Sequence, residues 1–162
     1  MKLQCNKCNK QLTTDLYPVK VKYKSMLPYY NKILNLKDIF VKEREVYEDM
    51  NGKEYVEYNF TSMKGGIFYM SKPKPMWNNK WDEERPAQIV RATKNMLVVG
   101  ESSILEGIVP PYYTGCGCCN HSMGEELTCE CGNTLGKMYL DCHEDKTVYF
   151  YPKAVRRYYN KG

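Results

Sequence analysis

Cysteine is the residue type of this 162-residue chain whose number and spacing point most directly to chemistry. Two thiolates on one tight turn lie close enough to bind the same metal ion, and zinc favours four such ligands in a tetrahedron. In a reducing compartment, grouped thiols bind metal ions more often than they form disulfides. The sequence therefore predicts a zinc-binding protein. Its eight cysteines form the groups Cys5 and Cys8, Cys116, Cys118 and Cys119, Cys129 and Cys131, and Cys142.

The first predicted site uses one cysteine turn from near each end of the chain, which is the usual arrangement of a zinc ribbon. No cysteine or histidine occurs between residues 9 and 115, so within one chain the first pair must share its metal with later ligands. Our first choice is Cys5, Cys8, Cys129 and Cys131. An alternative joins Cys5 and Cys8 to Cys119 and Cys142. A second site would use Cys118, Cys119 and Cys142 with His121 or His143, so one or two Zn²⁺ ions are expected.

The motifs around these cysteines resemble a group of uncharacterised bacterial and phage proteins. Those proteins have a leading C-x-x-C, a G-C-C run, a C-x-C-G or C-x-x-C-G turn, an Asp-Cys and a closing strand that ends in Pro-x-x-Val. The resemblance supports zinc binding and implies no activity. Cys116 usually has no counterpart in the group. The matching segments are Gly117-Cys118-Cys119-Asn120, Cys129-Glu130-Cys131-Gly132-Asn133, Asp141-Cys142 and Val148 to Val155.

Alternating apolar and polar residues predict a mainly β fold (α+β with little helix), with zinc-ribbon-like cysteine knuckles and an inserted antiparallel β region. Residues 16–24 read as a half-buried strand with a lysine face. Asn51-Gly52 predicts a type I′ hairpin turn within residues 44–60. A short helix is expected over residues 28–40, where apolar residues recur with helical spacing after Pro28. Further strands are predicted at 66–70, 89–90, 96–99, 139–140 and 148–151.

The length of the chain fits a single domain, residues 1–162, with a zinc module and an insertion. We predict the zinc module from residues 1–12 and 115–162, and the β-rich insertion from residues 13–114. No apolar run is long enough to span a membrane, and the N-terminus lacks the apolar stretch of a secretion signal. We therefore expect a cytoplasmic protein, in the host cytoplasm if it is phage-encoded.

Catalytic patterns do not occur in the sequence. It contains no H-E-x-x-H, no phosphate-binding G-x-x-x-x-G-K-[ST] and no zinc-deaminase signature. A catalytic zinc needs an open coordination position, whereas sites built from thiolates alone are usually closed. We therefore expect a non-enzymatic protein.

Three non-enzymatic functions remain after this exclusion. The first is a protein-interaction module, phage-encoded and acting on a host protein, with Trp77, Trp81, Tyr112 and Tyr113 as contact candidates. The second is a nucleic-acid-binding zinc ribbon, because residues 1–45 carry a net charge of +6 and residues 146–162 contain no acid. The third is a structural part of a larger assembly such as a virion. We favour a protein partner. The predicted nucleic-acid contacts are Lys20, Lys22, Lys24, Arg156 and Arg157.

Overall fold

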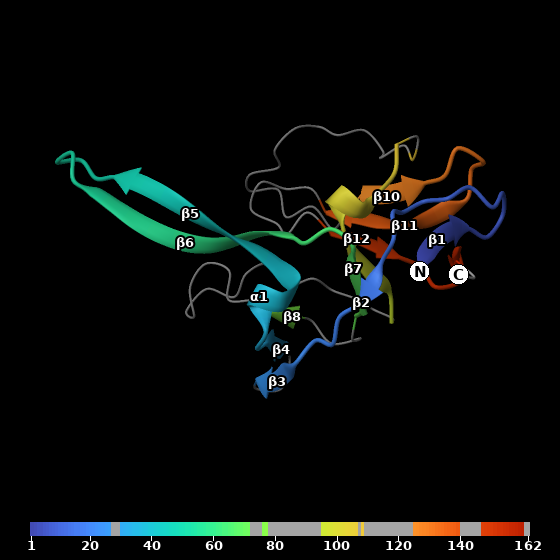
Figure 1. Cartoon of the computed structure of the whole chain (residues 1–162), viewed down its shortest axis with the longest axis horizontal. Helices are drawn as coiled ribbons and strands as arrows, with labels where there is room; N and C mark the ends of the chain where they lie inside the picture. Colours follow the sequence, from blue (N-terminus) through green and yellow to red (C-terminus); the bar gives the residue numbers. More distant parts are fainter. Residues whose placement is uncertain are drawn as a thin grey trace.

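A six-stranded sheet forms the centre of the fold (Figure 1). The structure, a computed structural model, describes residues 1–26, 30–71, 76–77, 95–106, 108, 125–139 and 147–160. The strand order is β10-β11-β12-β9-β7-β2, and neighbours are antiparallel except for the parallel pair β7 and β2. The predicted mainly β class is confirmed. These strands are β2 (Tyr17–Pro18), β7 (Ile67–Met70), β9 (Leu97–Gly100), β10 (Glu125–Thr128), β11 (Thr134–Tyr139) and β12 (Thr147–Phe150).

The two central strands, β9 and β12, are buried along their whole length because both faces of the sheet are covered. Alternate residues of a strand point to opposite faces. Leu97 and Phe150 therefore enter one core cluster, whereas Val98 and Tyr149 enter another. The sheet thus separates two cores, and each core has its own covering elements.

The first core lies under the two chain ends. Strand β1 (Lys2–Cys5) pairs antiparallel with β13 (Val155–Tyr158) in a separate two-stranded sheet. Leu3 and Cys5 from β1 pack in the same cluster as Leu127, Cys129 and Leu135 from the β10–β11 hairpin. Burial of these side chains therefore brings the two cysteine turns together at the edge of this core.

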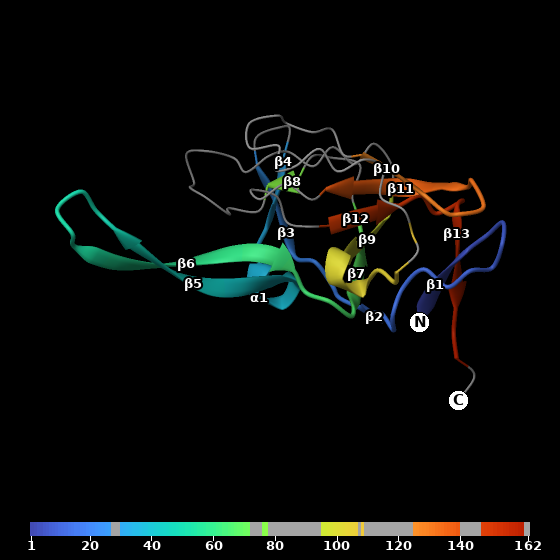
Figure 2. The same cartoon turned by 90° about the horizontal axis from the view of Figure 1, so that it is seen from above.

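The second core lies under a three-stranded sheet and the base of a long hairpin. Strand β3 (Tyr23–Met26) pairs with β4 (Tyr30–Ile33), which runs parallel to β8 (Met76–Trp77). Helix α1 (Leu36–Ile39) leads directly into β5 (Phe40–Glu48), which pairs with β6 (Glu54–Met63). The 3₁₀ turn η1 (Glu101–Ser103) follows β9. Ile39, Phe40 and Met63 are buried at the hairpin base. From there the hairpin projects away from the rest of the described chain (Figures 1 and 2).

The predicted helix over residues 28–40 is wrong for most of its length. Residues 30–33 form β4, and the helix is a single turn, Leu36–Ile39. The buried Asn35 side chain explains the interruption, because it accepts a hydrogen bond from the Lys22 amide and donates one to the Lys20 carbonyl. These bonds fix the chain beside residues 20–22, where β4 can pair with β3. Tertiary pairing thus overrides the helical spacing.

The hairpin at residues 44–60 is confirmed, but its turn is not type I′. The strands end at Glu48 and Glu54, and only Gly52 of the Asn51-Gly52 pair has a positive φ, of 76°. The Asp49 carboxylate accepts hydrogen bonds from the Asn51 and Lys53 amides, each 2.9 Å long. This side-chain closure replaces the two-residue turn with a longer loop.

Other predicted segments have mixed outcomes. The strand predicted at 16–24 is split into β2 and β3, although Val19 and Val21 are half-buried and the intervening Lys20 is exposed as predicted. Strands near 66–70, 96–99 and 148–151 are confirmed as β7, β9 and β12. The strand predicted at 89–90 lies outside the described residues. The central sheet takes strands both from residues 13–114 and from residues 115–162.

Candidate metal centre

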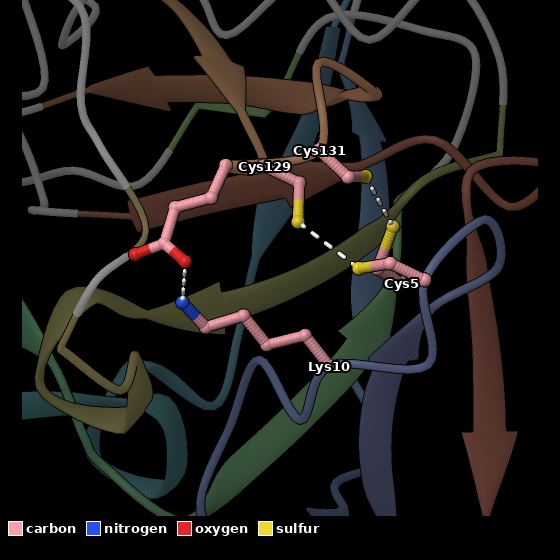
Figure 3. A network of polar contacts seen from close by, with 6 residues as sticks. Cys5, Lys10, Cys129 and Cys131 are labelled. Atoms are coloured by element: carbon pink, nitrogen blue, oxygen red, sulfur yellow. Dashed lines mark hydrogen bonds and ion pairs between the residues drawn. The ribbon is translucent and has the colours of Figure 1, made fainter.

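Four cysteine sulfurs from the two ends of the chain meet at one point (Figure 3). The Sγ atoms all lie within 4.8 Å of one another. The Cys5 and Cys131 sulfurs are 3.7 Å apart, and those of Cys8 and Cys129 are 3.6 Å apart. A tetrahedral zinc with sulfur ligands at about 2.3 Å requires sulfurs about 3.8 Å apart, whereas a disulfide requires about 2.0 Å. The observed spacing therefore fits four thiolates around one ion.

The first cysteine turn begins where β1 ends. The Cys5 carbonyl accepts a hydrogen bond from the Asn9 amide at 2.9 Å, and the Cys5 amide donates to the Lys10 carbonyl at 2.9 Å. Asn9 has a φ of 64°, a left-handed conformation that asparagine tolerates better than most residues. This turn buries Cys5 and leaves Cys8 exposed, so one side of the sulfur cluster faces solvent.

The second cysteine turn connects β10 to β11 and has a similar design. The Cys129 carbonyl accepts from the Gly132 amide at 2.8 Å, and the Cys129 amide donates to the Asn133 carbonyl at 2.9 Å. Gly132 has a φ of 83°, a left-handed conformation that glycine adopts without steric cost. The two turns thus present their sulfurs toward each other at the edge of the first core.

Asn133 links both turns to the C-terminal segment, a role that the sequence analysis missed. Its side-chain nitrogen donates to the Cys5 sulfur at 3.4 Å, and it contacts the Asn6 side-chain oxygen at 3.1 Å and the Ala154 carbonyl at 3.2 Å. The Asn6 side chain in turn donates to the Lys153 carbonyl. The available signal was the asparagine next to each cysteine turn, because outer polar groups commonly orient metal ligands.

Two lysines add exposed contacts between the turns. The Lys7 ammonium donates to the Cys131 carbonyl at 3.1 Å. Lys10 forms an ion pair with Glu130 at 2.6 Å (Figure 3), and the two side chains are 30% and 56% exposed. At such exposure the pair contributes at most about 1 kcal/mol, so it aligns the turns more than it stabilises them.

The thiol environments differ within the cluster. Burial raises the pKa of Cys5, but hydrogen bonds from the Cys8 amide, the Asn133 side chain and other groups of the turn outweigh burial and lower it to about 6. Burial raises the pKa of Cys129 to about 12, and the neighbouring sulfurs add to that rise. A divalent cation beside these sulfurs would oppose the effect of burial on Cys129 and stabilise the thiolate form of the ligands.

The remaining predicted ligands lie outside the described residues. They are Cys118, Cys119, Cys142, His121 and His143; Cys116, which was assigned to no site, also lies outside these residues. The second zinc site, and the alternative pairing of the first turn with Cys119 and Cys142, therefore stay predictions. Of the aromatic contact candidates, Trp77 contributes its backbone to β8, and Trp81, Tyr112 and Tyr113 are outside the described ranges.

The basic residues predicted to contact nucleic acid fall on two separate sheets. Lys24 belongs to β3, and Lys20 and Lys22 are the exposed residues that lead into it. Arg156 and Arg157 belong to β13, which pairs with β1. Figures 1 and 2 show β3 and β13 in different parts of the molecule. These residues therefore do not share one strand surface.

Comparison with known protein families, curated protein sequences and solved structures finds no match to this chain. None of the helices in the described ranges has the length and apolar character needed to cross a bilayer.

Proposed function

We propose that this chain is a small, non-enzymatic zinc protein in which the metal holds the two chain ends together and so supports a protein-binding surface. The observation that carries the proposal is the group of four mutually close sulfurs from Cys5, Cys8, Cys129 and Cys131. Zinc is the ion expected for four thiolates in a tetrahedral arrangement. A site closed by four protein ligands leaves no position for substrate, which supports a structural role for the metal.

Protein binding is favoured over nucleic-acid binding by the distribution of exposed side chains. A surface that follows a phosphate backbone needs its basic residues on one face, and here they belong to two sheets. Exposed apolar residues gather instead on the β5–β6 hairpin, where Val46, Tyr47, Tyr55 and Val56 lie near one another. The Val46–Val56 pair lies on one face of this ribbon and the Tyr47–Tyr55 pair on the other, because alternate residues of a strand point to opposite faces. Exposed apolar pairs of this kind favour an interaction site.

The proposal is tested first by elemental analysis of freshly purified protein that has not met a chelator. We expect at least one zinc per chain, and less than about half an equivalent would refute the zinc role. Affinity capture from host extract, with and without nuclease, then tests the partner class. Protein recovery that is unchanged by nuclease supports protein binding, and recovery that disappears with nuclease supports the nucleic-acid alternative.

A further inference from the structure

The distal half of the hairpin, residues 45–57, exposes apolar side chains that no described element covers. β5 and β6 form a two-stranded sheet of their own. Val46 and Val56 face each other across it and are 51% and 42% exposed, and Met50 in the loop is fully exposed. A two-stranded ribbon alone in water is only marginally stable. This part of the chain therefore gains stability if another surface covers it.

The same half of the hairpin is acidic, in a chain that is otherwise basic. Residues 45–57 hold five acidic side chains and one lysine, a net charge of −4, so the rest of the chain carries +9. Glu48 lies directly opposite Glu54, and Glu45 lies opposite Glu57. Like charges at such positions destabilise a strand pair. Within the described part of the chain, Glu48 and Glu54 have no ion pair or side-chain hydrogen bond, so a cationic surface would stabilise both.

A surface of matching chemistry lies at the base of the hairpin. Lys20, Lys22 and Lys24 are exposed because the residues that alternate with them pack toward the second core. Leu34, which is 56% exposed, sits beside these lysines, since its amide donates to the Lys22 carbonyl at 2.8 Å. The described residues offer none of the three ammonium groups an ion pair. We name these three lysines and Leu34 the basal patch.

The distal half of a hairpin projects away from the basal patch of its own chain. Asn35 ties the Lys20–Lys22 segment to the residues just before α1, and α1 leads directly into β5. The hairpin then extends from this base away from the body (Figure 1). Two copies whose hairpins lie antiparallel would each place an acidic end on the basal patch of the other. Such a contact is closed and two-fold symmetric.

We propose that the hairpin docks on a second copy of this chain, so that the protein forms an arm-exchanged dimer. The Val46–Val56 pair covers Leu34 of the other copy. Glu48 and Glu54, which lie two positions further along the same face, meet the lysines of its basal patch. Each copy contributes both a hairpin end and a basal patch. The number of residues on each side of the interface therefore approaches the roughly 20–30 of a standard interface. This dimer is independent of the nature of the metal, and it is tested in the zinc-loaded protein.

The test is a charge exchange followed by sedimentation equilibrium. Wild-type protein is expected to move from chain mass toward twice that mass as concentration rises, and to shift back in high salt because screening weakens exposed charge pairs. The hairpin variant Glu48→Lys/Glu54→Lys and the patch variant Lys22→Glu/Lys24→Glu should each dimerise about a hundredfold more weakly, since like charges then meet. An equimolar mixture of the two variants should dimerise again, because opposite charges meet at both contacts.

A matched control separates specific docking from net charge. Glu101→Lys/Glu106→Lys makes the same change in charge at two exposed positions outside the hairpin, and it should leave the dimer intact. The hairpin variant replaces one like-charged pair, Glu48 and Glu54, by another, so the repulsion across the strand pair stays the same. Circular dichroism should therefore show an unchanged fold. A wild-type protein that stays monomeric at all concentrations, or variants that fail to associate when mixed, would overturn the proposal. Loss of zinc with the dimer retained would instead contradict only the proposed metal role.

Discussion

Replacing Cys5 and Cys8 together by serine should loosen the chain far from the substitutions. A metal held between the two turns would join residues separated by 121 positions at Cys8 and Cys129, and by 126 at Cys5 and Cys131. Such a cross-link removes conformational freedom from the unfolded chain, as a disulfide does. The double substitution therefore acts on the folding of the whole domain as well as on metal binding.

The size of this effect follows from the length of the closed loop. In the chain-entropy treatment, a cross-link that closes about 100 residues stabilises a protein by about 4.7 kcal/mol. We therefore expect the free energy of unfolding to fall by about 4–5 kcal/mol in the variant. For a domain of this size each kcal/mol corresponds to about 2–4 °C, so Tm should fall by about 8–20 °C.

Thermal unfolding and hydrogen exchange measure the two parts of this prediction. β13 pairs only with β1 among the described strands, so amide protection over residues 155–158 should fall in the variant. The β5–β6 hairpin makes its own strand pairs and serves as an internal control. Chelation of zinc from the wild-type protein should reproduce the change. If the variant kept its zinc and its protection over 155–158, the idea that the metal ties the chain ends would be wrong.

Three further substitutions test the details of the site. Asn133→Ala should weaken zinc binding about 10–100-fold in a competition with a chromogenic chelator, because it removes a donor to the Cys5 sulfur, while Asn51→Ala in the exposed hairpin loop should not. Gly132→Ala should lower unfolding stability by about 1–2 kcal/mol through its left-handed φ alone, since a Cβ there meets nothing within 4 Å. Gly136→Ala should destabilise more in the same denaturation assay, because its Cβ would lie 1.9 Å from the Tyr149 carbonyl oxygen; an equal effect of the two glycine substitutions would contradict this contrast.

Local patterns were enough to predict the strand-rich fold and the residues of the cysteine turns. Short runs of apolar residues predicted β7, β9 and β12, and most residues of these strands are buried within the sheet. The spacing of Cys5 with Cys8, and of Cys129 with Cys131, marked two tight turns. No cysteine or histidine lies between residues 9 and 115, so within one chain Cys5 and Cys8 had to share a metal with ligands from the C-terminal part of the sequence. The structure brings together Cys5, Cys8, Cys129 and Cys131, the four cysteines of the preferred site. The identity of the metal stays a prediction.

Features that depend on distant contacts could not be predicted from local patterns. The segment at 30–33 has helical spacing, yet it pairs with β3 because Asn35 fixes its position. β13 reads as a basic tail, and its strand character comes from pairing with β1 at the other end of the chain. Asn133 is similar: its role depends on Cys5 and Ala154, which approach it only in the folded chain.

The most direct test of the central claim is zinc X-ray absorption spectroscopy of a chain in which the four other cysteines are changed to serine. Those cysteines are Cys116, Cys118, Cys119 and Cys142. Circular dichroism first establishes that the variant keeps its strand content. We predict one zinc per chain, with four sulfur neighbours at about 2.3 Å. A folded variant that retains no zinc, or whose zinc has oxygen or nitrogen among its four nearest neighbours, would contradict the account.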